Sequence, residues 1–276
     1  MINRMSTPVK VGVIALLVLV SVVSIFPVVW AVLTSLKTRV DTFATPPVWF
    51  FAPNFDSYFS LFRDYDVMSY VANSVTITLV STALTLAFGA LSAYALSTMR
   101  FRGRGVFLMI VIMLRMIPPV VLITPLYQLA LTTGLFDTQL VLIIVYTALN
   151  IPFAIWLLKG FFDDVPRELL ESAQVDGCGR FGVFRRIVVP VSLPGFFATA
   201  VFTFVLCWND FLFAFMLTSS KARTLPVFGA SFIGDQGIQW GQMTAAGTVI
   251  LIPVIVFSLI VQRWLVKGLT AGGVKG

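Results

Sequence analysis

Residues 11–36 read VGVIALLVLVSVVSIFPVVWAVLTSL and contain no charged side chain. A bilayer core about 30 Å thick is crossed by about 20 apolar residues of α-helix, so this run is long enough to span a membrane. It is too long for the apolar region of a signal peptide, and no small-residue cleavage site follows it, so we expect it to be retained. The stretch predicts a membrane protein.

The composition indicates the same class of protein. Of 276 residues, 58% are hydrophobic and 11% are charged, whereas a soluble domain carries about 25% charged residues. This excludes a cytosolic enzyme, a disordered regulator and a DNA-binding module. The formal net charge of +7 does not indicate a nucleic-acid partner, because the basic residues lie between long apolar runs.

Six apolar stretches predict an all-α, polytopic membrane protein. Because no internal repeat stands out in the sequence, residues 1–276 are expected to form a single transmembrane domain. Two external loops, 37–70 and 218–241, and a cytoplasmic loop, 159–190, connect the spans. The expected spans are 11–36, 71–99, 105–133, 139–158, 191–217 and 242–264.

The distribution of basic residues predicts the orientation. With the N-terminus in the cytoplasm, 13 of the 19 Lys and Arg residues fall on the cytoplasmic side and five on the other, with Arg115 inside the membrane. By the positive-inside rule, both termini are cytoplasmic.

Several catalytic and metal-binding chemistries are excluded. The chain has no histidine, so it has no histidine acid–base catalysis and no histidine metal site. Cys178 and Cys207 make no CxxC or zinc spacing and are expected to be two free thiols. No GxxxxGK[ST] phosphate-binding loop is present, so this chain is expected to bind no nucleotide itself.

The cytoplasmic loop is expected to form a rigid protrusion of two short helices. Asp164 is a suitable N-cap for a helix that has Pro166 in its first turn. Gly177 can adopt a positive φ and end that helix. A basic helix over about 179–188 follows, and Pro190 breaks the chain before the fifth span.

This loop resembles the "EAA" loop of ABC-importer membrane subunits, which in that family is the coupling helix that docks into the ATPase subunit. Ser172 replaces the first alanine of the family pattern. Taken alone, Glu171 would be interpreted as part of a solvated helix face. The matching residues are Glu171, Ser172, Ala173, Asp176, Gly177 and Pro190.

Two further stretches narrow the resemblance to the second permease subunit of maltose-type carbohydrate importers. They are Trp208-Asn209-Asp210-Phe211 and the tail 268–276, GLTAGGVKG. The resemblance covers nearly the whole chain and implies a type I permease fold in a bacterial or archaeal cytoplasmic membrane. It also implies that the tail contacts the ATPase, through Thr270, Gly272, Gly273 and Lys275.

The resemblance implies ATP-driven import of a sugar, without enzymatic activity in this chain. The implied partners are a second permease subunit, two ATP-binding subunits that hold ATP and Mg²⁺, an external sugar-binding protein and membrane lipid. The sugar stays open between a disaccharide such as trehalose or maltose, a longer oligosaccharide and a polyol.

Polar residues inside the spans are candidates for the substrate path. Arg115 lies about 15 Å into the third span, where it is expected to face a cavity or to pair with a partner subunit or snorkel to the interface. Trp208, Asn209 and Asp210 suit sugar hydroxyls, or else form an interfacial belt and a helix cap. The weaker candidates, which also suit interhelical hydrogen bonds, are Tyr146, Asn150 and Gln128.

Prolines and small residues predict local features of the spans. Pro118-Pro119 and Pro152 are expected to bend their helices, either at a gate or where helices cross. Gly89 and Ala93 predict close helix packing. An ion channel or carrier would require intramembrane carboxylates, and a membrane enzyme would require a catalytic motif. The sequence favours neither.

Overall fold

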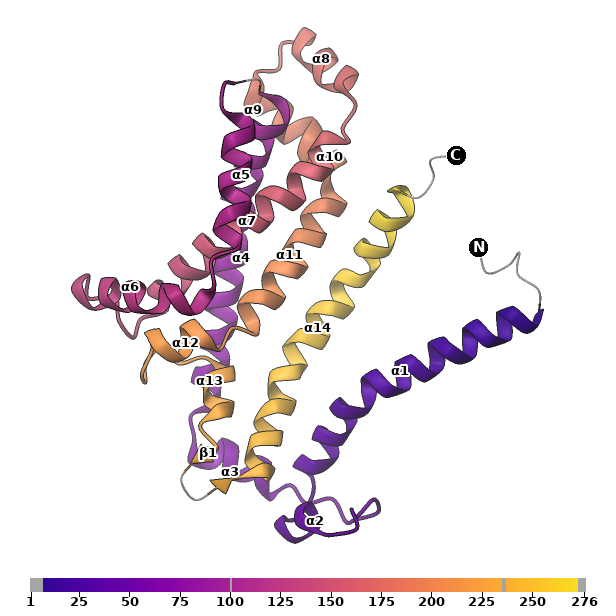
Figure 1. Cartoon of the computed structure of the whole chain (residues 1–276), viewed down its shortest axis with the longest axis vertical. Helices are drawn as coiled ribbons and strands as arrows, with labels where there is room; N and C mark the ends of the chain where they lie inside the picture. Colours follow the sequence, from indigo (N-terminus) through magenta and orange to yellow (C-terminus); the bar gives the residue numbers. More distant parts are fainter. Residues whose placement is uncertain (1–6, 100, 235–236, 273–276) are drawn as a thin grey trace. The chain divides into compact units, whose positions relative to one another are not determined.

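The computed structural model describes residues 7–99, 101–234 and 237–272, with the backbone alone for residues 261–272. The chain divides into two compact units. The first contains residues 1–67 and 228–251, and the second contains residues 68–227 and 252–276. Long helices dominate, as predicted for an all-α membrane protein (Figure 1).

The first unit begins with a long apolar helix whose side chains are largely exposed within the described part of the chain. In α1, Thr7–Ser35, the most apolar 18-residue window has no buried residue. Apart from a small antiparallel hairpin, with Ile233 opposite Ile238, the unit is helical. Its further elements are α2 Arg39–Phe43, α3 Asp56–Asp64, β1 Ile233–Gly234, β2 Gly237–Ile238 and the start of α14 Trp240–Gly272.

The second unit is a bundle in which α7 lies centrally, packed against both α5 and α11. A π-helical segment, Phe184–Val188, lies between α9 and α10. A further helix, α13 Leu225–Ala230, runs from this unit into the first. The other helices are α4 Val67–Thr98, α5 Arg104–Arg115, α6 Pro119–Thr132, α7 Gln139–Asp163, α8 Arg167–Val175, α9 Arg180–Val183, α10 Val189–Val191, α11 Leu193–Trp208 and α12 Leu212–Leu217.

Four helices, α1, α4, α7 and α14, are long and apolar enough to cross a membrane, and two bent pairs bring the number of candidate spans to as many as six. The expected third span, 105–133, is one of these pairs, because α5 and α6 meet at 90°. Pro118 is extended at the break, with φ −60° and ψ 127°, since a residue that precedes a proline avoids the helical region. The predicted bend at Pro118-Pro119 is confirmed, whereas α7 continues through Pro152.

The expected fifth span, 191–217, is also interrupted. Its main helix α11 ends at Trp208, and α12 begins only at Leu212. On the other side, the helical stretch 180–191 meets α11 at 78°. The break lies at Ser192 (φ −95°, ψ 14°) and not at Pro190. Pro190 stays helical after a π-helical turn, in which the Val189 N–H bonds to the Phe184 carbonyl.

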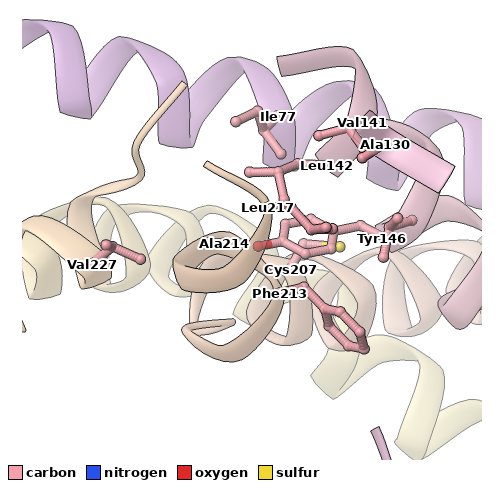
Figure 2. Close-up of a cluster of buried hydrophobic side chains, with 11 residues drawn as sticks. Ile77, Ala130, Val141, Leu142, Tyr146, Cys207, Phe213, Ala214, Leu217 and Val227 are labelled. Atoms are coloured by element: carbon pink, nitrogen blue, oxygen red, sulfur yellow. The ribbon is translucent and has the colours of Figure 1, made fainter. Parts of the chain in front are cut away.

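The core of the second unit lies between α4, α6, α7, α11 and α12. Figure 2 shows Ile77 of α4, Leu142 of α7 and Leu217 of α12 directed toward one another. Farther along α4, a Cβ added at Gly89 would lie 2.7 Å from the Cβ of Ala154. The close helix packing predicted from Gly89 is confirmed, because only glycine permits this approach of α4 to α7.

Asp137, in the turn between α6 and α7, fixes the chain that follows α12. Its carboxylate accepts hydrogen bonds from the backbone N–H groups of Ser219, Ser220, Lys221 and Ala222, at 2.9–3.2 Å. Its own N–H donates to the Leu217 carbonyl at 3.0 Å. The sequence indicated only a short turn here, so this clamp is a feature that the sequence analysis missed.

Asn73, near the start of α4, holds the same segment from another side. Its amide donates to the carbonyls of Lys221 and Arg223, at 2.9 and 3.1 Å. The Gln139 amide donates in turn to the Asn73 side-chain oxygen at 2.6 Å. Residues 217–223 are therefore held by α4, through Asn73, and by the turn between α6 and α7, through Asp137.

The Asp137 clamp predicts a pH-dependent stability. Partial burial acts to raise the pKa of Asp137, but the four N–H groups outweigh it and lower the pKa to about 2. The stabilisation is complete above the unfolded pKa of about 3.9 and is lost as the pH falls toward about 2. Because the carboxylate is partly solvated, we expect it to contribute about 1 kcal/mol. Melting temperatures measured from pH 6 to pH 2 should fall less in Asp137→Asn than in wild type, and Glu168→Gln, at an exposed site, should follow wild type. Parallel curves for Asp137→Asn and wild type would contradict the clamp.

Candidate functional site

The predicted coupling loop, 159–190, contains a short helix, α8, that begins later than the sequence predicted. Asp164 is the C-cap of α7 and not the N-cap of α8. Pro166 holds the N-cap position in an extended conformation (φ −56°, ψ 132°), and α8 begins at Arg167. The prediction of an Asp164 cap was wrong because α7 extends past its apolar part to Asp163.

Gly177 ends α8 in a Schellman motif. Its φ is +82°, its N–H bonds to the Gln174 carbonyl at 3.1 Å, and the Cys178 N–H bonds to the Ala173 carbonyl at 2.9 Å. These are the two hydrogen bonds that define the motif. The predicted positive φ at Gly177 is confirmed, and the bend it makes leads directly into α9.

One face of α8 is anchored on the bundle. Ala173 is buried and lies in a cluster with Tyr94, Phe162 and Val183. The Tyr94 hydroxyl also donates to the Arg180 carbonyl at 2.9 Å, which fixes the start of α9 to α4. The loop is therefore held in place by apolar packing and by a hydrogen bond.

The other face of α8 is free in this chain. Glu171, Ser172, Asp176 and Gly177 are exposed, and Val175 exposes 88% of its surface. Within the described part of the chain, Glu171 makes no hydrogen bond or ion pair. Figure 1 shows α8 at the end of the second unit, beyond α9.

A cavity of about 560 Å³ lies between α8 and the ends of α4, α5 and α7. Asp163 at its wall accepts a hydrogen bond from the Ser97 hydroxyl at 2.7 Å and pairs with Lys159. The residues that line it come from α4, α5, α7 and α8 and include Arg104, Arg167 and Glu171. Both signs of charge therefore meet beside the exposed face of α8.

A second polar cluster lies where α7 passes the break between α11 and α12. The Tyr146 hydroxyl donates to Asp210 Oδ1 at 2.8 Å, and the same oxygen accepts the backbone N–H groups of Phe213 and Ala214, at 3.1 and 3.3 Å. Asp210 therefore caps the first turn of α12. Asn150 donates to the Tyr146 carbonyl at 2.8 Å.

Arg115 completes this cluster. It is the last residue of α5, and its guanidinium donates to the Leu149 carbonyl at 3.2 Å and lies 5.7 Å from the ring centroid of Phe153. Arg115, Tyr146, Asn150 and Asp210 line one cavity of about 360 Å³. The structure thus brings together four of the residues predicted to line a substrate path.

Trp208 and Asn209 do not join this cavity. The Trp208 ring is 1% exposed and stacks on Phe204 at a centroid distance of 5.7 Å, so neither face is open to a sugar in this conformation. Asn209 is exposed and donates back to the Val205 carbonyl at 3.0 Å. Both side chains complete the end of α11 here.

Cys207 accepts a hydrogen bond from the Asn150 amide at 3.4 Å, and Cys178 follows Gly177 at the end of α8. Cys178 and Cys207 are free thiols, as predicted. Thr270 and Gly272 belong to the backbone of α14, and Gly273 and Lys275 lie outside the described residues. Among the residues that the structure describes, no group of three His, Cys, Asp or Glu side chains could hold a metal ion.

Comparison with known protein families gives one match, which includes α8 and most of the bundle. The model of the "Binding-protein-dependent transport system inner membrane component" family matches residues 85–271. The chain belongs to this family. The resemblance drawn from the cytoplasmic loop is confirmed at the level of the family.

Two named relatives cover nearly the whole permease. This chain is 42% identical over 253 residues to the "Probable ABC transporter permease protein y4oR" of Sinorhizobium fredii. The aligned region covers 92% of this chain and 91% of the relative. It is 37% identical over 259 residues to the "Trehalose transport system permease protein SugB" of Mycobacterium tuberculosis, with 92% and 93% covered.

A solved structure shares the fold of the permease. The crystal structure of a bacterial ABC transporter involved in the import of the acidic polysaccharide alginate matches with a TM-score of 0.76 at 20% identity. The match covers 94% of this chain and 98% of that one. The chain is thus the inner-membrane permease component of a binding-protein-dependent ABC transport system, a transport subunit and not an enzyme.

The Asp210 cluster predicts graded effects on the stability of the permease. Asp210→Ala removes the cap of α12 and leaves the Tyr146 hydroxyl without its acceptor, so we expect a loss of about 1–2 kcal/mol. Tyr146→Phe removes one hydrogen bond and should cost about 1 kcal/mol. Asp210→Asn keeps an acceptor and is the matched control. In detergent, the melting temperature should decrease least in Asp210→Asn, more in Tyr146→Phe and most in Asp210→Ala. A wild-type melting temperature for Asp210→Ala would contradict the cap.

Proposed function

We propose that this chain passes a sugar through the membrane and receives the energy of ATP hydrolysis through α8. The observation that carries the proposal is the geometry of α8: Ala173 fixes one face to the bundle, while Glu171 and Ser172 stay exposed on the other. A surface that transmits force must be both rigidly attached and free to bind a partner. The matched family model includes this helix, which supports the assignment.

The proposed assembly consists of this chain, a second permease subunit, two ATP-binding subunits that hold ATP and Mg²⁺, and an external sugar-binding protein. Residues 1–276 act as one multi-pass permease domain of a bacterial or archaeal cytoplasmic membrane, with both termini in the cytoplasm. The positive-inside distribution of Lys and Arg supports this orientation. The tail from Thr270 to Lys275 is proposed as a further contact with the ATPase.

The proposed substrate is a di- or oligosaccharide such as trehalose or maltose, or a polyol. The relative from Mycobacterium tuberculosis is named for trehalose transport, which supports the disaccharide. The cavity at Arg115, Tyr146, Asn150 and Asp210 is proposed as part of the path, because its amide, hydroxyl and guanidinium groups can bind sugar hydroxyls.

The coupling role predicts that Gly177→Val uncouples ATP hydrolysis from sugar uptake. No atom lies within 4 Å of a Cβ added at Gly177, so the cost comes from the positive φ, about 1–2 kcal/mol for a β-branched residue. Gly177→Asn is the matched control, because asparagine tolerates this conformation. Uptake and sugar-stimulated ATPase activity should be measured in proteoliposomes that carry the full complex.

Glu171→Ala should have a milder effect, because an exposed ion pair contributes about 0–1 kcal/mol. Normal coupling in Gly177→Val, at normal membrane insertion, would show that the loop only connects two helices. Equal defects in the Val and Asn variants would show that the backbone conformation at Gly177 is not the cause.

The substrate path predicts that Arg115→Gln weakens sugar uptake. Losing a charged hydrogen-bond donor should raise the KM for uptake about tenfold, since such a bond contributes about 1.5 kcal/mol, and leave basal ATPase activity unchanged. Arg102→Gln removes the same charge from an exposed connection and is the control. An unchanged KM in Arg115→Gln would remove this residue from the path.

A further inference from the structure

Lys37, just after α1, is a buried cation that forms no ion pair with the residues the structure describes. It exposes 5% of its surface, and its Nζ lies 4.4 Å from the ring centroid of Trp30 and 5.3 Å from that of Phe51. No carboxylate of the described residues pairs with it. A buried lysine is rare unless it is paired, so this ammonium group requires an explanation.

Lys37 lines a cavity of about 280 Å³ in the first unit. Arg39 lines it too, is exposed, and makes no ion pair with a described residue. The carboxylate of nearby Asp41 accepts a hydrogen bond from the Thr38 hydroxyl at 2.6 Å instead. The cavity wall therefore carries two positive charges that this part of the chain does not neutralise.

The first turn of α14 adds to the positive potential. Residues 239–242, which include the first three residues of this 33-residue helix, line the cavity. The first N–H groups of a helix have no acceptor within the helix, and the helix dipole places partial positive charge there. Thr42 and Ser57 complete the wall, and the Thr42 hydroxyl donates to the Thr38 carbonyl at 2.9 Å.

The cavity lies at the end of an apolar helix, α1, whose most apolar 18-residue window has no buried residue among those the structure describes. Phe26, Trp30 and Trp49 cluster near the end of α1, with the two indole centroids 5.0 Å apart. Tryptophan gathers where the hydrocarbon meets the headgroups of a bilayer. If α1 spans the membrane, this tryptophan cluster places Lys37 close to the lipid phosphates, and the exposed apolar surface of α1 offers a place for acyl chains.

We propose that this cavity binds the phosphate group of an anionic phospholipid, held by Lys37, Arg39 and the first turn of α14. A partner protein could offer a carboxylate instead, but a carboxylate would leave the exposed surface of α1 unused. The proposal concerns the first unit only and does not depend on the coupling role of α8.

The test is native mass spectrometry of the full-length, delipidated chain in detergent, titrated with phosphatidylglycerol or with phosphatidylcholine of the same acyl chains. Wild type should bind phosphatidylglycerol about fivefold more tightly than phosphatidylcholine, as expected for a basic residue at an anionic headgroup. Lys37→Gln should abolish the preference, Arg39→Gln should reduce it, and Lys37→Arg should keep it. Arg63→Gln, at an exposed arginine paired with Asp64, should behave as wild type.

Equal retention of the two lipids by wild type would overturn the proposal and leave a protein carboxylate as the better occupant. Displacement of phosphatidylglycerol by glycerol 3-phosphate or inorganic phosphate would also overturn it, because the site would then bind a free anion. If Lys37→Gln fails to fold, as judged by circular dichroism, the exposed Arg39→Gln variant carries the test, and its unchanged preference would overturn the proposal.

Discussion

Hydrocarbon offers no water to a peptide group, so each backbone N–H and C=O of a membrane helix needs a partner within the protein. The breaks in this bundle follow that constraint. Where the chain leaves α11, Asp210 takes up the N–H groups of Phe213 and Ala214 at the start of α12. Where α5 ends, Arg115 donates to the Leu149 carbonyl of α7. Asp210, which is proposed to line the sugar path, therefore also satisfies the backbone at the break between α11 and α12.

The residues that line the candidate path also bond to the backbone of the bundle. Tyr146 and Asn150 lie one turn apart on α7, and each hydrogen-bonds to a group that belongs to the helix breaks or to α7 itself. A substitution here alters the packing of the bundle as well as the lining of the cavity. Stability and transport therefore have to be measured together at this site.

Much of the architecture could be predicted from the sequence because the deciding signals are local. Uncharged runs of more than 20 residues predict spans, a proline pair predicts the break after α5, and Gly177 predicts a left-handed end to α8. The bend at Ser192 could not be predicted, because it depends on a π-helical turn that keeps Pro190 helical. The burial of Trp208 depends on packing with Phe204. The Asp137 clamp depends on a segment about 80 residues away. Neither feature has a local signal in the sequence.

The continuity of α7 has a mechanical consequence. At about 1.5 Å per residue, its 25 residues form a strut about 38 Å long. One end carries the turn at Asp137, which grips the chain after α12, and the other end contacts α8 through Phe162. Because α7 is unbroken from Gln139 to Asp163, a push on the α8 end is expected to displace the Asp137 end as well. With the proposed orientation and coupling role, such a lever would carry mechanical work between the two faces of the membrane without a relay of separate parts.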